Sequence, residues 1–184
     1  EGDKLKNIFL SLFHSDYQTT VASMLKKISN QINFYIIGQL LVASSVAITS
    51  IIGLYILQWL TGIIIPYTVL IGIIAGLFNL IPFAGPIIGT IPAIIFYLVT
   101  DQPMQIELIY VLFIIGNFII VQLIDNFIMS PYIMGASIGI HPLLVIIIVL
   151  LGASVGGILG MLLAIPIIVI IKVIINELII NFGD

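Results

Sequence analysis

The order of apolar and polar positions divides the chain into a short amphipathic start and a long series of apolar blocks. Apolar residues recur with a helical period over residues 3–13, and again over residues 21–32, where Lys26 and Lys27 occupy the opposite face. This period predicts two amphipathic helices of the kind that lie in a membrane interface. We therefore expect residues 1–33 to form a cytoplasmic or interfacial region.

The remaining residues, 34–184, are expected to form a single transmembrane domain. Residues 34–60 carry no charge and exceed the about 20 residues that cross a hydrocarbon core. Residues 108–124 form a further apolar run of spanning length. Most of the lysines precede the first span, so the positive-inside rule places the N-terminal side in the cytoplasm of a multi-pass protein of the inner or plasma membrane.

Proline and glycine interrupt two of the apolar blocks, at residues 78–92 and 152–160. Proline removes a backbone donor, and broken backbone at bilayer depth is tolerated only where protein or water satisfies the freed groups. Each block is predicted to form a helical hairpin, and the pattern leaves open whether its arms span the bilayer or re-enter it. Polar connectors are expected at residues 101–107 and 130–140. The expected hinge or gating residues are Pro92, Gly152, Gly156, Gly157, Gly160 and Pro166.

Composition fixes the class of the protein and excludes several functions. The chain is 61% hydrophobic and 7% charged, against about 25% charged in soluble domains. The fold class is therefore an all-α, polytopic membrane protein. Cysteine and arginine are both missing from the sequence, and the two histidines are far apart. We expect no metal, no cofactor and no nucleic-acid partner, and no arrangement typical of an enzyme is present.

Hydroxyl and amide side chains inside the apolar blocks each need a partner. The hydroxyl residues are predicted to form a helix-packing face; they are Ser44, Ser45, Thr49 and Ser50. Asn79 could either satisfy carbonyls freed by the proline break or face a substrate, and both interpretations stay open. His141 could titrate near neutral pH or cap the helix that Pro142 begins.

An acidic residue at the end of a span is the strongest candidate for chemistry. Gln122, Asp125 and Asn126 share one helical face by their spacing. An acid inside a membrane is a functional-site candidate, whereas an acid at the interface is simply hydrated; the sequence leaves both possible. The expected lining of a solute or ion pathway is Gln39, Asn79, Pro82, Gly85, Pro86, Gln122, Asp125, Asn126 and His141.

A weak internal repeat relates residues 34–100 to residues 104–182, because each segment has one span followed by a broken block. Paired broken segments in corresponding positions are typical of transporters that bind their substrate between repeats. The pattern therefore favours a secondary transporter that works by alternating access.

Five segments together resemble the AI-2E family, which is named after autoinducer-2 exporters. They are YIIGQLLVA (35–43), LFNLIPFAGPIIGTIPA (77–93), QLIDNFIMSPYIMG (122–135), GIHPLLVI (139–146) and GGILGMLLAIP (156–166). Members of this family are longer on the N-terminal side, so the chain resembles their C-terminal portion. Asp125 stands where the family usually carries an acidic residue.

The resemblance implies export of a small polar signal such as autoinducer-2, or exchange of sodium or lithium for protons. Amide groups suit a sugar-like diol, whereas an antiporter needs the carboxylate of Asp125. A different class of function, a membrane scaffold that assembles through small-residue helix faces, fits the serine and glycine clusters as well. The expected partners are the lipid bilayer, a solute or a cation with a proton, and further copies of the chain.

Overall fold

The computed structural model describes residues 10–11, 14–100, 108–134 and 141–182, and all regular structure in these ranges is helical. The elements are α2 (Ser15–Thr61), α3 (Thr68–Phe78), α4 (Ala84–Val99), α5 (Leu108–Ile124), the π-helix η1 (Asp125–Met129), α6 (Ser130–Met134) and α7 (Pro142–Phe182). The all-α class is confirmed. Apart from residues 10 and 11, the helix predicted over 3–13 lies outside the described residues, as does the connector over 101–107.

The long helix α2 joins two predicted elements into one. Its 47 residues correspond to a length of about 70 Å, well beyond the about 30 Å of a hydrocarbon core. No proline interrupts it, so the helix passes through residue 33, where a boundary was expected. It ends at Gly62, whose φ of 74° is the left-handed conformation that glycine adopts most easily, and whose N–H donates to Gln58 O.

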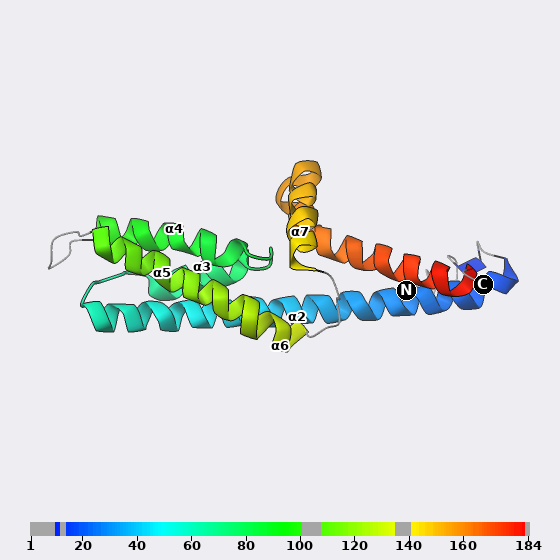
Figure 1. The fold of residues 1–184 in the computed structure, drawn as a ribbon, viewed down its shortest axis with the longest axis horizontal. Coiled ribbons are helices and arrows are strands. Elements are labelled where there is room, and N and C mark those ends of the chain that lie inside the picture. The colour runs from blue at the N-terminus through cyan, green and yellow to red at the C-terminus, as the bar shows by residue number, and fades with distance from the viewer. Residues whose placement is uncertain (1–9, 12–13, 101–107, 135–140, 183–184) are drawn as a thin grey trace.

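A short hairpin, α3 and α4, packs along the C-terminal half of α2 (Figure 1). Close approach depends on Gly72 and Gly76 of α3, because a Cβ at Gly76 would lie 2.7 Å from the Ala43 carbonyl oxygen. The helices have 11 and 16 residues, fewer than the about 20 of a full span. The break is narrower than predicted: it covers residues 79–83, and Pro92 lies inside α4.

Helix α5 runs back beside this hairpin and continues without interruption through η1 and α6 to Met134. The connector predicted at residues 130–140 is therefore wrong for its first five residues, which are helical. The rest of that connector lies outside the described residues. By length and composition, three helical segments among the described residues can cross a membrane: Gln18–Thr61, Leu108–Met134 and Leu143–Glu177. These segments make the chain a multi-pass membrane protein.

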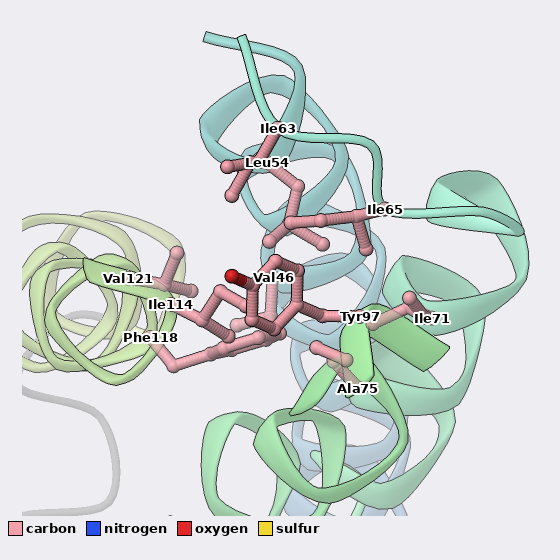
Figure 2. Close-up of a cluster of buried hydrophobic side chains, with 11 residues drawn as sticks. Val46, Leu54, Ile63, Ile65, Ile71, Ala75, Tyr97, Ile114, Phe118 and Val121 are labelled. Atoms are coloured by element: carbon pink, nitrogen blue, oxygen red, sulfur yellow. The ribbon is translucent and has the colours of Figure 1, made fainter. Parts of the chain in front are cut away.

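Side chains from α2, α3, α4 and α5 form one buried apolar cluster (Figure 2). Val46, Tyr97 and Phe118 are each at most 2% exposed. The Tyr97 ring meets the ring of Tyr110 edge-on at 6.3 Å. This cluster fixes the rotation of α5 relative to α2, and so decides which α5 side chains face the hairpin.

Helix α7 reverses direction at two glycines. Gly156 (φ −131°, ψ 15°) and Gly157 (φ 57°, ψ −138°) have non-helical backbone, so α7 is a hairpin of two arms, as predicted. The arms touch where Gly152 crosses Gly160, because a Cβ on either would meet backbone of the other. Pro166, by contrast, lies inside the second arm.

The second arm of α7 runs antiparallel to the N-terminal half of α2 and lies away from α3, α4 and α5 (Figure 1). Tyr35 of α2 packs there with Ile165 and Val169. Further along, Lys27 Nζ lies 2.6 Å from Glu177 Oε2, and Ser23 Oγ donates to Glu177 Oε1 at 3.3 Å. The long helix therefore carries two separate packing partners along its length, the α3–α5 bundle and the α7 hairpin. Each predicted repeat segment does contain a helix followed by a hairpin, and the repeat itself stays a prediction.

Candidate substrate and ion site

The break between α3 and α4 brings three polar side chains from distant parts of the chain together. Gln39, Asn79 and Asp125 are 6%, 1% and 4% exposed. Gln39 Nε2 donates to the backbone carbonyl of Asn79 at 2.6 Å. Asn79 Nδ2 donates to Asp125 Oδ2 at 3.4 Å. An amide on α2 thus satisfies a carbonyl freed at the break, while the amide of the break itself contacts the carboxylate.

Asp125 lies at the first residue of the π-helix, and this geometry supplies its second partner. Ser130 N–H donates to the Asp125 carbonyl, the i to i−5 bond of a π-turn. The same residue donates from Oγ to Asp125 Oδ1 at 2.9 Å. Single π-turns inserted in α-helices occur often at functional sites. Both hydrogen bonds to the carboxylate that are seen among the described residues come from neutral groups, so the acid sits in a polar but uncharged surrounding.

The side-chain oxygen of Asn79 is buried and has no hydrogen-bond partner among the described residues. Its neighbour is Gly85 at the start of α4, where an added Cβ would fall 2.6 Å from Asn79 Cβ and 2.8 Å from Oδ1. Glycine is therefore required for Asn79 to occupy this position. A buried acceptor without a donor costs about 1–3 kcal/mol, so this oxygen is suited to a donor or a cation that binds from outside the protein.

Four other predicted pathway residues are neighbours in sequence of the members of this cluster. Pro82 lies in the turn and is half-buried, and Pro86 is buried one residue after Gly85. Gln122 donates from Nε2 to Asn126 Oδ1 at 3.0 Å on the helix that carries Asp125. These residues therefore lie on the same two segments as Asn79 and Asp125.

His141 and the α7 glycines are not part of the cluster. His141 is exposed, and its Nδ1 accepts from the N–H of Leu143 at 3.3 Å, which is the capping role considered for it. The expected hinge glycines lie in the α7 hairpin, which among the described elements packs mainly against α2.

Sequence reasoning missed Ser130 as a partner of the carboxylate. It lies five positions after Asp125, which on an ordinary α-helix would turn its side chain about 140° away from the carboxylate. Only the π-turn brings positions i and i+5 onto one side. Ser44 and Ser45, by contrast, bond carbonyls of their own helix at 2.8 Å and 2.9 Å. Ser44 is exposed, so the predicted packing face does not include it.

The chemistry available in this cluster is that of oxygen ligands and amide hydrogen bonds. No group of three or more His, Cys, Asp or Glu occurs among the residues that the structure describes, so a divalent site of that type is not seen there. The oxygens of Asp125, Asn79 and Ser130 would suit a hard monovalent cation. The same groups would equally bind the hydroxyl groups of a small solute.

Comparisons with known proteins agree with the membrane architecture. A family model described as "AI-2E family transporter" matches residues 1–180. The chain is 32% identical to YueF of Bacillus subtilis (strain 168) over 172 residues, which are 94% of this chain and 43% of YueF. It is 33% identical to YrrI of the same organism over 83% of this chain and 40% of YrrI.

A more distant relative carries a name for its cargo. The AI-2 transport protein TqsA of Escherichia coli (strain K12) is 27% identical over 71% of this chain and 37% of TqsA. The chain thus spans less than half the length of these curated relatives. No solved structure matches the chain.

Proposed function

The chain belongs to the AI-2E family of transporters, and on that premise we propose that it forms part of a secondary transporter which exports a small polar solute of the autoinducer-2 kind. The observation that carries the proposal is the buried cluster of Gln39, Asn79 and Asp125 at the broken hairpin. Buried polar groups in membrane helices are costly and mark transport pathways. We propose transport and no catalytic step.

The hairpin of α3 and α4 is proposed to be the gating element. Its arms are too short for ordinary spans, and its turn contains Phe83 with a φ of 69°, a strained conformation for a bulky residue. Strain of this kind persists where surrounding structure holds it, and is typical of switch regions. In our proposal the hairpin re-enters the membrane and moves against α2 and α5, so that Asn79 and Asp125 face each side in turn.

A second candidate function is exchange of sodium or lithium for protons, and one observation favours it. Asp125 is the only acidic residue in the cluster, and it accepts hydrogen bonds from the Asn79 amide and the Ser130 hydroxyl. A carboxylate that binds either a cation or a proton couples their exchange, because a low-dielectric site does not hold both charges.

Orientation and assembly complete the proposal. We place the lysine-bearing N-terminal part of α2 on the cytoplasmic side of the cell membrane, following the positive-inside rule. Assembly into a homo-oligomer is also proposed. The glycines of α3 are already used in packing against α2, so they are not free to form a scaffold interface, which weighs against a purely structural role.

The test is transport by the complete protein in proteoliposomes, with imposed pH and sodium gradients and with autoinducer-2 as solute. We expect Asp125→Asn to abolish coupled flux. Glu177→Gln is the matched control, because it makes the same change at a buried acid outside the cluster, and it should transport like the wild type. Solute flux that responds to neither the pH gradient nor the sodium gradient, in the wild type or in either variant, would contradict the exporter. Sodium–proton exchange without any solute flux would instead establish the antiporter.

A further inference from the structure

Two further buried polar atoms, Ser50 Oγ on α2 and Asn117 Nδ2 on α5, have no hydrogen-bond partner among the described residues. Asn117 precedes Asp125 by eight residues, a separation of about 12 Å along the helix. Its amide packs directly over Gly53 of α2, where an added Cβ would fall 3.2 Å from Asn117 Cγ. The missing side chain at Gly53 is what makes room for this amide.

The orientation of the amide follows from its contact with Gly53. The nearest atom of Asn117 to that glycine is Oδ1, which can accept the weak bonds that Cα hydrogens donate. Asn117 Nδ2 is buried and has no hydrogen-bond partner among the described residues.

Ser50 is the second member of this set. It lies one turn before Gly53 on α2 and is 0% exposed, and its Oγ also lacks a hydrogen-bond partner within the described part of the chain. The neighbouring Thr49 behaves differently, since its hydroxyl donates to the Ser45 carbonyl at 2.8 Å. Buried polar groups in native structures are nearly always satisfied, so the two groups are suited to a ligand.

An apolar layer separates this set from the Asp125 cluster. Val46 lies one turn before Ser50 on α2, and Val121 lies midway between Asn117 and Asp125 on α5. Val46, Val121 and the adjoining Phe118 are each at most 2% exposed, and Figure 2 shows them within one cluster. The layer closes the direct route between the two polar regions in this conformation.

We propose that Asn117 and Ser50 form a second binding site, which takes a hydroxyl or carbonyl oxygen of a small neutral solute. The available groups are an N–H donor and a hydroxyl, so the ligand must offer an acceptor, and the amide hydrogens disfavour a cation. This inference rests on the proposed function: it supplies the solute with a site on each side of the Val46–Val121 layer, and it assigns the cargo to the polyol class.

Cysteine labelling tests the site without a transport measurement, because the sequence contains no cysteine of its own. Single variants Ser50→Cys and Asn117→Cys of the complete protein, with any cysteine outside this sequence changed to Ser, are treated in membranes with 2-aminoethyl methanethiosulfonate. Val46→Cys is the control within the apolar layer, and Ile48→Cys is the control on the exposed apolar face of α2. Gel filtration and circular dichroism establish that each variant is folded.

We expect the cysteines at 50 and 117 to react at least about tenfold faster than the one at 46, because a charged reagent reaches them only through water-accessible space. Erythritol should slow their modification, and sodium chloride should not. Reaction rates equal to those of the two controls would overturn the site. Labelling that erythritol leaves unchanged, or that sodium slows instead, would overturn the assignment to a neutral solute. Either result leaves the effect of Asp125→Asn on transport unaffected, so failure here is distinct from failure of the proposed function.

Discussion

Asn79 Nδ2 donates a hydrogen bond to Asp125 Oδ2 at 3.4 Å, across 46 residues of sequence. This contact connects the turn of the α3–α4 hairpin with the first residue of the π-helix. Any movement of the hairpin relative to α5 must break or remake it. In the transport cycle that we propose, this pair is where a conformational change and the binding of a cation, proton or solute are coupled.

Replacing the amide of Asn79 should uncouple this pair while leaving the hairpin turn intact. In Asn79→Leu the Asp125 carboxylate loses one of its two observed partners, a loss of about 1.5–3 kcal/mol for a bond to a charged group. The bond from Gln39 goes to the backbone of residue 79 and survives. We expect transport in proteoliposomes to fall at least tenfold at unchanged helix content. The exposed Asn176→Leu is the control, and equal loss in both variants would contradict a specific role for Asn79.

A methyl group at position 85 should displace Asn79. The added Cβ of Gly85→Ala meets the Ala75 carbonyl and the Asn79 side chain, neither of which can turn aside easily. Overpacking of this kind costs about 1–3 kcal/mol, measured as the shift of thermal unfolding in detergent, and transport should fall with it.

Gly116→Ala is the matched comparison for Gly85→Ala. Its added Cβ would meet nothing within 4 Å, and alanine is better than glycine inside a helix by about 0.5–1 kcal/mol. We expect this variant to be at least as stable as the wild type. If both variants shifted the unfolding temperature alike, close approach at Gly85 would not be the cause.

The turn of α7 should distinguish its two adjacent glycines. Gly157 has φ 57° and ψ −138°, a region that is almost restricted to glycine, so Gly157→Ala should lose about 1–3 kcal/mol. Gly156, with a φ of −131°, should accept alanine with little change. An added Cβ meets no atom at either position, so backbone conformation alone separates the two. Unfolding in detergent measures both, and a larger loss at 156 would refute this account of the turn.

Contact between α2 and the second arm of α7 should respond to charge at Lys27 and Glu177. Lys27 is half exposed and Glu177 nearly buried, so Lys27→Glu should weaken the contact by about 1 kcal/mol, the upper end for a partly exposed pair. Exchanging the two charges in the double variant Lys27→Glu/Glu177→Lys should restore part of that loss. The readout is thermal unfolding at low and high salt, and absence of any rescue would show that the pair contributes nothing.

Much of the helical layout could be predicted from the chain because it depends on local properties. Uncharged runs fix the spans, and the residues at 79–83 and 156–157 fix the breaks, since proline and glycine act on their own backbone. Errors arose where proline is tolerated by its surroundings, as at Pro92 and Pro166 inside helices. The continuity of α2 through residue 33 was also missed. The side-chain pattern changes there from amphipathic to uniformly apolar, but the backbone remains helical across the change.

The candidate site was predicted only in part, for a different reason. Spacing selected Asn79 and Asp125 as unusual polar residues, and family resemblance supported the acid. Whether these two residues face each other depends on how α5 is rotated against α2 and α3. The same rotation decides that Ser50 and the Nδ2 atom of Asn117 are buried. Ser130 joins the pair only because of the π-turn.

The sequence by itself determined that this protein is a helical membrane protein with two broken hairpins and few polar groups in its interior, because hydrophobicity and backbone preference are local. Tertiary structure decided which polar groups meet. Close contacts at Gly53, Gly76 and Gly85 set the helix separations, and packing around Phe118 sets the rotation of α5. Helix separation and rotation depend on how surfaces that are far apart in the sequence pack together, so no local sequence pattern predicts them.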